Sequence, residues 1–281
     1  MPSVKTTKGL PIFLALLLVA GAARAEKLKE RFDKTFPLKP GARVELENIN
    51  GPVIFEAWDR AEVRIEAEKW AESKRADVLK KALANVRIEV SQKPGVLKIQ
   101  TKVPNDQNGF MDWLLGKEVK LGANYRVRVP RQAVIAASNV NGDLNLAGTR
   151  GQASLVNVNG AISVNGVQGD LTLQTVNGEI ALARTQGGVQ ANTVNGGIKA
   201  DLNGVPDDLS FETVNGAVEI RLPANSRLTL DASMSHGVVQ SDFKVVGNSP
   251  KKSNVLKGDV NGGGNRVTIR SVNGVIEVSK I

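Results

Sequence analysis

A glycine recurs at every ninth residue through the middle of this chain. The seven positions are 142, 151, 160, 169, 178, 187 and 196. Every second glycine ends a short motif, Asn-Val-Asn-Gly or Thr-Val-Asn-Gly, and these motifs follow one another at intervals of 18, 18, 18 and 20 residues. Repeats of a fixed length in this range are typical of solenoids, in which one supersecondary unit stacks on the next. The repeat therefore predicts a stack of equivalent β-rich coils.

Apolar residues occupy fixed places around each motif glycine. The fifth and seventh residues before it, and the second and fourth residues after it, are apolar in all five units. Around Gly160 these residues are Ala153, Leu155, Ile162 and Val164. Such period-two alternation on both sides predicts two short strands that meet at an Asn-Gly corner.

Asn-Gly is also the favoured dipeptide of a two-residue hairpin turn, so a β-meander is the competing interpretation. We favour the solenoid because hairpins are free to vary in length, whereas stacked coils must keep one length. The expected fold is all-β, a single-chain β-solenoid (β-helix) of about 18–20 residues per coil, with aliphatic ladders along its axis.

The corners are expected to play a structural role. Glycine supplies unusual backbone angles, and stacked asparagines can bond one another because each amide both donates and accepts. The expected structural corners are Asn50, Gly51, Asn141, Gly142, Asn159, Gly160, Asn177, Gly178, Asn195, Gly196, Asn215, Gly216, Asn273 and Gly274.

The same spacing of apolar residues around an Asn-Gly pair occurs near both ends of the chain, around Gly51 and around Gly274. A degenerate coil is expected near His236-Gly237. Residues 246–264 contain a proline, several lysines and three consecutive glycines, and are expected to form a loop inserted in a late coil.

Residues 59–130 do not follow the repeated spacing of glycine and apolar residues. Their patterns predict strands, one helix from Glu72 to Asn85 and a hairpin, a small α+β insert that would cap the N-terminal end of the solenoid. The expected division of the chain is a signal peptide at 1–25, an N-terminal segment with the first coil at 26–58, the inserted cap at 59–130 and solenoid repeats at 131–281.

The first 25 residues are typical of an export signal. Lys5 and Lys8 precede an apolar stretch, and Ala23-Arg24-Ala25 fits a cleavage site. An uncleaved N-terminal anchor is the alternative. No later stretch is apolar for long enough to span a membrane, so we expect an exported product without a transmembrane segment, periplasmic or at the cell surface. Cleavage would remove three basic residues and lower the net charge from +9 to +6.

Composition excludes several kinds of chemistry. The chain has no cysteine and one histidine, which excludes disulfides, thiol nucleophiles and multi-histidine metal sites. Calcium-binding nonapeptide repeats need Asp at a fixed place in every unit, whereas the residue after each glycine varies here. We therefore expect no cofactor. His236 occupies the asparagine place of the degenerate corner and is expected to be a turn residue, although its pKa would suit a general base.

Two pairs of acidic residues, Glu212 with Glu219 and Asp207 with Asp208, are the nearest candidates for the carboxylates of a glycosidase or lyase. Acidic residues form no recurrent outward column, as they would along a dedicated groove. We therefore expect a protein that is not an enzyme. A polysaccharide-active β-helix lyase or hydrolase is the alternative.

Two segments are candidate contact surfaces. Phe110, Trp113 and Leu114 have helical spacing and could dock on a partner or a membrane, or could plug the end of the core. A group of basic residues could face anionic polymers or lipid headgroups, or simply be solvated. This group consists of Lys69, Lys74, Arg75, Lys80 and Lys81. Nucleic acid is not an expected partner because aromatic residues do not alternate with these basic residues.

The order of these motifs resembles a known family. The grid x-V-N-G-x-[VIL]-x-[VIL], the early Asn50-Gly51 unit with its Trp58-Asp59 pair, and the strand Tyr-x-Val-x-Val-Pro before the repeats are similar to the bacterial "putative adhesin" family. This is an exported β-strand-repeat domain of unknown function. The resemblance implies a β-helical cell-envelope protein and brings no catalytic or binding residues with it.

The expected function is a structural, adhesive or ligand-binding role at the bacterial cell envelope. The expected partner is an envelope component of unknown identity, either a polysaccharide, a lipid surface or a protein. An envelope-stress or signalling accessory that binds a membrane partner through residues 110–115 is a further alternative.

Overall fold

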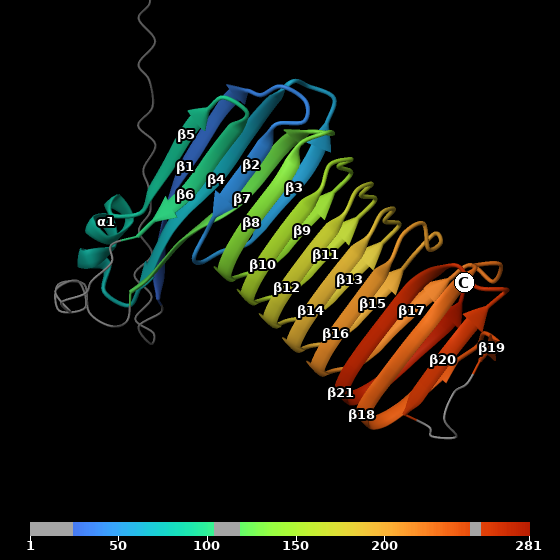
Figure 1. The fold of residues 1–281 in the computed structure, drawn as a ribbon. Coiled ribbons are helices and arrows are strands. Elements are labelled where there is room, and N and C mark those ends of the chain that lie inside the picture. Colours follow the sequence, from blue (N-terminus) through green and yellow to red (C-terminus); the bar gives the residue numbers. More distant parts are fainter. Residues whose placement is uncertain (1–24, 104–118, 248–253) are drawn as a thin grey trace, which may run out of the picture.

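The computed structural model describes residues 25–103, 119–247 and 254–281. Residues 1–24 of the expected export signal lie outside this part, as do Phe110, Trp113 and Leu114. The described chain is mostly β-strand, and its 21 strands form one open sheet. Figure 1 shows this sheet as a row of stacked coils with the N-terminal strands and one helix at one end.

Each central coil contains one long and one short strand. The long strands are β8 (Val134–Asn141), β10 (Ala153–Asn159), β12 (Leu171–Asn177), β14 (Val189–Asn195) and β16 (Leu209–Asn215). The short strands are β9 (Leu144–Ala147), β11 (Ile162–Asn165), β13 (Ile180–Ala183), β15 (Ile198–Asp201) and β17 (Val218–Leu222). Each strand pairs in parallel with the equivalent strand of the next coil, which confirms the solenoid and excludes the hairpin meander.

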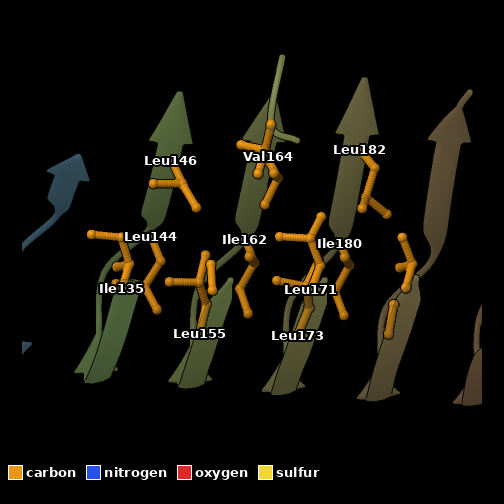
Figure 2. Close-up of a cluster of buried hydrophobic side chains, with 14 of the residues drawn as sticks. Ile135, Leu144, Leu146, Leu155, Ile162, Val164, Leu171, Leu173, Ile180 and Leu182 are labelled. Carbon is orange, nitrogen blue, oxygen red and sulfur yellow. The ribbon is translucent and has the colours of Figure 1, made fainter. Parts of the chain in front are cut away.

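The core lies between the long-strand layer and the short-strand layer. Leu155 pairs with Leu173 in the next coil, and Ile162 pairs with Ile180. All four side chains are buried, and Figure 2 shows them in rows that follow the solenoid axis. The inward places are those predicted from the alternation around the corner, because a strand presents every second side chain to one face.

The N-terminal coil is formed by β2 (Arg43–Glu47) and β3 (Val53–Trp58), which stack on β8 and β9. The chain then continues outward through five elements. These are β4 (Glu62–Ser73), α1 (Ala76–Ala84), β5 (Arg87–Lys93), β6 (Val96–Lys102) and β7 (Lys120–Pro130). Because β6 and β7 pair in parallel with β2 and β3, the insert adds a further coil of its own.

Two features of this end differ from the sequence-based expectation. Strand β1 (Glu26–Pro37) was not expected, and it pairs antiparallel with β4 along its whole length. Helix α1 is shorter than the predicted Glu72–Asn85 because Glu72 and Ser73 continue β4, where β1 pairs with them. Pairing with a neighbouring strand has therefore overridden the local helical pattern.

At the other end, the last strand lies inside the stack. Strand β21 (Asn265–Lys280) pairs with both β16 and β17, and β18 (Leu228–Ser241) covers it. His236 lies opposite Asn273 and Gly237 opposite Gly274, which confirms the degenerate coil.

The expected loop at 246–264 is partly strand. β19 (Val245–Val246) and β20 (Val255–Val260) form antiparallel pairs beside β18. The apolar pattern of β20 is interrupted by Lys257, Gly258 and Asp259. This segment is nevertheless a strand because it forms backbone hydrogen bonds with the edge of β18.

Candidate functional site

The corner asparagines form a continuous hydrogen-bonded ladder along the solenoid. Each side-chain Nδ2 donates to the Oδ1 of the asparagine in the preceding coil, at 2.7–2.9 Å. The ladder runs through Asn50, Asn141, Asn159, Asn177, Asn195, Asn215 and Asn273. At its first member, the Nδ2 of Asn50 donates to the backbone oxygen of Leu121 at 2.7 Å. All the amides point the same way, so each bond polarises the next.

The first residue of the motif satisfies a backbone group inside the corner. Thr175 donates its hydroxyl to the carbonyl oxygen of Gly160 at 3.1 Å, and Thr193 makes the same bond to Gly178 at 3.0 Å. In an earlier coil the Nδ2 of Asn157 donates to the carbonyl oxygen of Gly142 at 2.9 Å. Asparagine occupies this place in the first two repeats and threonine in the next three, and either one can supply the donor.

The motif glycine is required by close approach of the coils. A Cβ on Gly178 would lie 2.0 Å from the carbonyl oxygen of Gly160, and one on Gly196 would lie 2.0 Å from that of Gly178. No side chain fits at that distance. Three of the four motif letters are thus explained by the stacking of the coils.

The valine of the motif has no such explanation, because its side chain points out of the long-strand layer. The valines at this place are 37–41% exposed in every one of these coils. They are Val140, Val158, Val176, Val194, Val214 and Val272. The sequence reasoning missed this column, although the same alternation that buries the residue before it would have placed it outward.

These valines border a broad surface without charge, which we call the uncharged face. It consists of the outward residues of β8, β10, β12 and β14, and none of them is ionisable. They are Ala136, Ser138, Val140, Ser154, Val156, Val158, Thr172, Gln174, Val176, Gln190, Asn192 and Val194. Half of these residues are alanine or valine, and the other half are serine, threonine, glutamine or asparagine. The apolar part of the face is the row of exposed valines, and exposed apolar side chains that lie together often mark a binding site.

The outward side of the short-strand layer has a different character toward the C-terminal coils. Lys199 pairs with Glu179 at 2.9 Å, and this contact raises the pKa of the lysine. Arg221 pairs with Asp201 and holds the pKa of that carboxyl below its usual range. None of the large hydrophobic side chains exposed on the described surface belongs to β9, β11, β13, β15 or β17.

The structure separates the first candidate carboxylate pair and gives backbone partners to the second. Glu212 points outward from β16 and Glu219 outward from β17, on opposite layers of the solenoid. Asp208 accepts a hydrogen bond from the backbone nitrogen of Arg266 at 2.8 Å, and Asp207 accepts one from the backbone of Asp208 at 2.8 Å. The two aspartates therefore hold backbone groups at a turn.

The remaining candidate residues are also placed by the structure. His236 is exposed and continues the corner column next to Asn273. Lys69 pairs with Glu30 at 2.8 Å, and Arg75 pairs with Asp77 at 2.8 Å. The other basic candidates, Lys74, Lys80 and Lys81, are exposed around α1. The basic group is therefore divided between a strand and the helix region.

No metal site is evident in residues 25–103, 119–247 and 254–281, where no cluster of three His, Asp or Glu side chains is placed to hold an ion. In the same part of the chain, no helix has the length and hydropathy needed to cross a membrane.

A buried polar network joins the insert to the first coil. The Tyr125 hydroxyl lies 2.7 Å from the hydroxyl oxygen of Thr101, which donates to the Oδ1 of Asn48 at 2.8 Å. The Nδ2 of Asn48 donates to the backbone oxygens of Gly51 and Ala123. Burial raises the pKa of Tyr125 to about 12, opposed in part by the Thr101 hydrogen bond.

Comparison with known proteins gives one family and several distant structures. Residues 133–279 match the Toastrack DUF4097 family. No curated protein matches the sequence. A "putative cell adhesion protein" from Clostridium sporogenes is 12% identical, with 90% of this chain and 100% of that chain covered and a TM-score of 0.36. A "putative adhesin" from Bacteroides fragilis is also 12% identical, with coverages of 90% and 97% and a TM-score of 0.34.

A "putative lipid binding protein" from Parabacteroides distasonis is 12% identical, with coverages of 89% and 96% and a TM-score of 0.26. The family match is the more informative result, because it spans more than half of the chain and includes all the central coils. This protein belongs to the Toastrack DUF4097 family.

Proposed function

We propose that this protein is a non-catalytic binding module of the bacterial cell envelope, and that it holds an envelope component on its uncharged face. The observation that carries the proposal is the row of exposed valines. The motif repeats this valine in coil after coil, although stacking requires only the asparagine or threonine, the second asparagine and the glycine.

The shape of the molecule supports a binding role. Parallel coils bonded along their whole length make a rigid support, and a rigid support loses little conformational entropy when it binds. The export-signal pattern at residues 1–25 supports a location outside the cytoplasm. The carboxylates that a glycosidase would need lie on opposite layers or bind backbone groups. The geometry therefore favours binding over hydrolysis.

Retention of envelope material on the immobilised protein tests this proposal. Polysaccharides, lipid vesicles and envelope proteins are offered separately to the wild type and to a double variant, Val158→Glu with Val176→Glu. A second double variant, Val158→Lys with Val176→Lys, shows whether the sign of the charge matters. We expect both double variants to lose retention while keeping the wild-type melting temperature, because the valines are exposed.

Charged residues at Ser163 and Ala181, on the outward side of the short-strand layer, provide the matched control, and we expect them to leave retention unchanged. Retention of nothing by the wild type, or equal loss at the control positions, would contradict the proposal.

A further inference from the structure

We propose that a basic hollow beside the N-terminal coils binds a phosphate monoester, carried either by a lipid headgroup or by a soluble sugar phosphate. The hollow has a volume of about 410 Å³ and is lined by segments that are far apart in the chain. Its lining includes Pro40, Trp58, Asp59, Arg60, Arg131 and Arg150. None of these residues belongs to the uncharged face, so this site is independent of the proposed function.

The three arginines of the hollow come from three neighbouring turns. Arg60 lies between β3 and β4, Arg131 between β7 and β8, and Arg150 between β9 and β10. The backbone nitrogen of Arg150 donates to the carbonyl oxygen of Arg131 at 2.6 Å, so these two residues are held side by side. Stacking of the coils therefore brings together basic residues that are distant in the sequence.

One carboxylate of the lining faces these three cations. Asp59 accepts two hydrogen bonds from Arg131, at 2.5 and 2.9 Å, and these bonds lower the pKa of Asp59. Arg60 contacts Glu62 at 3.4 Å, an exposed pair that contributes little. Arg150 makes no ion pair and no side-chain hydrogen bond within the described part of the chain. Three cations and one anion leave a net charge of +2 on the lining, and a bound anion would relieve the repulsion between neighbouring arginines.

Stacking of the coils does not require an arginine at position 150. One and two coils later, this place is occupied by Gln168 and Gln186, which pair with each other. The backbone nitrogens of Arg150, Gln168 and Gln186 make the same hydrogen bond to the preceding turn. A neutral side chain therefore satisfies the fold at this place, and stacking leaves the positive charge of Arg150 unexplained.

The walls of the hollow are held in place. Trp58 donates its indole N–H to the backbone oxygen of Glu62 at 2.7 Å. The Arg60 guanidinium lies over the Trp58 ring, 5.1 Å from its centroid. Pro40 and Pro130 also line the hollow, and the ring of a proline fixes its backbone angle φ. A site whose groups are already ordered loses little conformational entropy when a ligand binds.

The chemistry of the lining fits a phosphate monoester. A guanidinium presents a planar fork of N–H donors that matches two oxygens of a phosphate. A phosphate monoester carries about 1.5 to 2 negative charges at pH 7, close to the net charge of +2 on the lining. Arg60 and Arg150 are the two arginines that Asp59 does not bond, so their donors are the ones that would bind the phosphate.

Titration calorimetry of the purified protein at low ionic strength tests the site, because salt screens exposed charges. The probes are glucose 6-phosphate and vesicles of phosphatidylcholine that contain phosphatidic acid. Glucose and vesicles of phosphatidylcholine alone are their neutral controls. We expect binding of a phosphate-bearing probe and none of the controls. Binding of glucose 6-phosphate would show that a soluble sugar phosphate is sufficient, whereas binding of the vesicles alone would identify a lipid headgroup.

Three variants locate the binding. Arg150→Gln introduces the residue of the later coils and should raise the dissociation constant by about 10-fold, and Arg60→Gln with Arg150→Gln should raise it by about 100-fold. The matched control is Arg87→Gln, which removes the same charge from an exposed arginine of β5, opposite Lys102. We expect this control to leave the dissociation constant unchanged, and all three variants to keep the wild-type melting temperature.

Failure of the wild type to bind either phosphate-bearing probe would overturn the inference. Equal losses in Arg150→Gln and Arg87→Gln would overturn it as well, because they would show that only the net charge of the protein attracts the phosphate.

Discussion

At the scale of single residues, Tyr125 offers the clearest test because it is the only tyrosine of the chain. A phenol in an unfolded chain ionises near pH 10, whereas burial raises the pKa of Tyr125 to about 12 in the folded protein. Between these values the unfolded chain has lost the proton that the folded protein still holds. The free energy of unfolding should therefore be unaffected by this group below pH 10 and fall by about 2 to 3 kcal/mol as the pH rises to about 12.

Phenolate absorbance of the native protein measures the pKa directly, and urea unfolding between pH 9 and pH 12 measures the loss. Lysines also titrate in this range, so Tyr125→Phe provides the control: it should lack the part of the loss that belongs to the phenol. A native phenol that titrates near pH 10 would contradict the account.

Two buried threonines limit the stability of the solenoid. The hydroxyl oxygens of Thr149 and Thr185 are buried without a hydrogen-bond partner, and Val167 occupies the equivalent place in the coil between them. Thr149→Val and Thr185→Val should each raise the free energy of unfolding by about 1 kcal/mol, because an unsatisfied hydroxyl costs about 1–3 kcal/mol. Urea unfolding checks this. A loss of stability in either variant would show that its hydroxyl does have a partner.

Single residues could be predicted from the sequence where the motif repeats them, and could not be predicted where their contacts depend on residues outside the motif. The asparagine ladder was expected because each amide can donate and accept, and all seven members form it. The outward placement of the valine was missed, because the motif letters were interpreted only as corner chemistry. The network at Tyr125 could not be predicted, since Thr101 and Asn48 meet it only through the stacking of β6 on β2.

At the scale of the elements, the corner sets the distance between coils. Gly178→Ala should lower the free energy of unfolding by about 2–4 kcal/mol, because the new Cβ would lie 2.0 Å from a backbone oxygen of the preceding coil, so that the two coils must separate. Gly188→Ala is the matched control: its Cβ would lie 3.4 Å from the nearest atom, an ordinary contact. We expect that variant to stay within about 1 kcal/mol of the wild type.

Thermal unfolding of the two variants gives the comparison. Similar losses in both would mean that the glycines are needed for reasons other than the close approach of the coils.

The elements that the sequence did not predict are those held by a neighbour. Strand β1 is rich in alternating charges, and its pairing with β4 includes ion pairs such as Lys29 with Glu68 at 2.9 Å. Strand β20 contains a lysine, a glycine and an aspartate in its middle. Neither has the apolar alternation of a strand that packs on a core. Charged residues on an outermost strand also discourage further strand addition, which explains why β1 has this composition.

At the scale of the whole molecule, both ends of the stack have the same construction. At each end, one coil stacks directly on the repeats and a further coil or strand stacks on the outside of it. The chain passes between this inner layer and the outer one. At the N-terminal end β2 and β3 lie between the repeats and the coil of β6 and β7. At the C-terminal end β21 lies between β16 and β18. The outermost strands on both sides are antiparallel, so the parallel repeats are closed at each end.

The sequence predicted this arrangement in part. The motif grid around Gly51 and Gly274 indicated coils near both termini, and the structure confirms that they stack on the repeats. The order of the outer strands depends on contacts between segments far apart in the chain. A local sequence pattern does not indicate such contacts.

The central claim is that the chain is a stack of interchangeable coils whose register of 18 residues keeps the uncharged face continuous. Small-angle scattering of a variant that lacks residues 161–178 tests it most directly. This deletion removes β11 and β12 and joins Gly160 to Glu179, so that β10 meets β14 in register. We predict a cooperatively folded protein whose longest dimension is shorter by about 5 Å, one strand spacing. Deletion of residues 161–169 would put a long strand into the short-strand layer and should abolish folding. An unfolded 18-residue deletion, or a nine-residue deletion that folds equally well, would contradict the account.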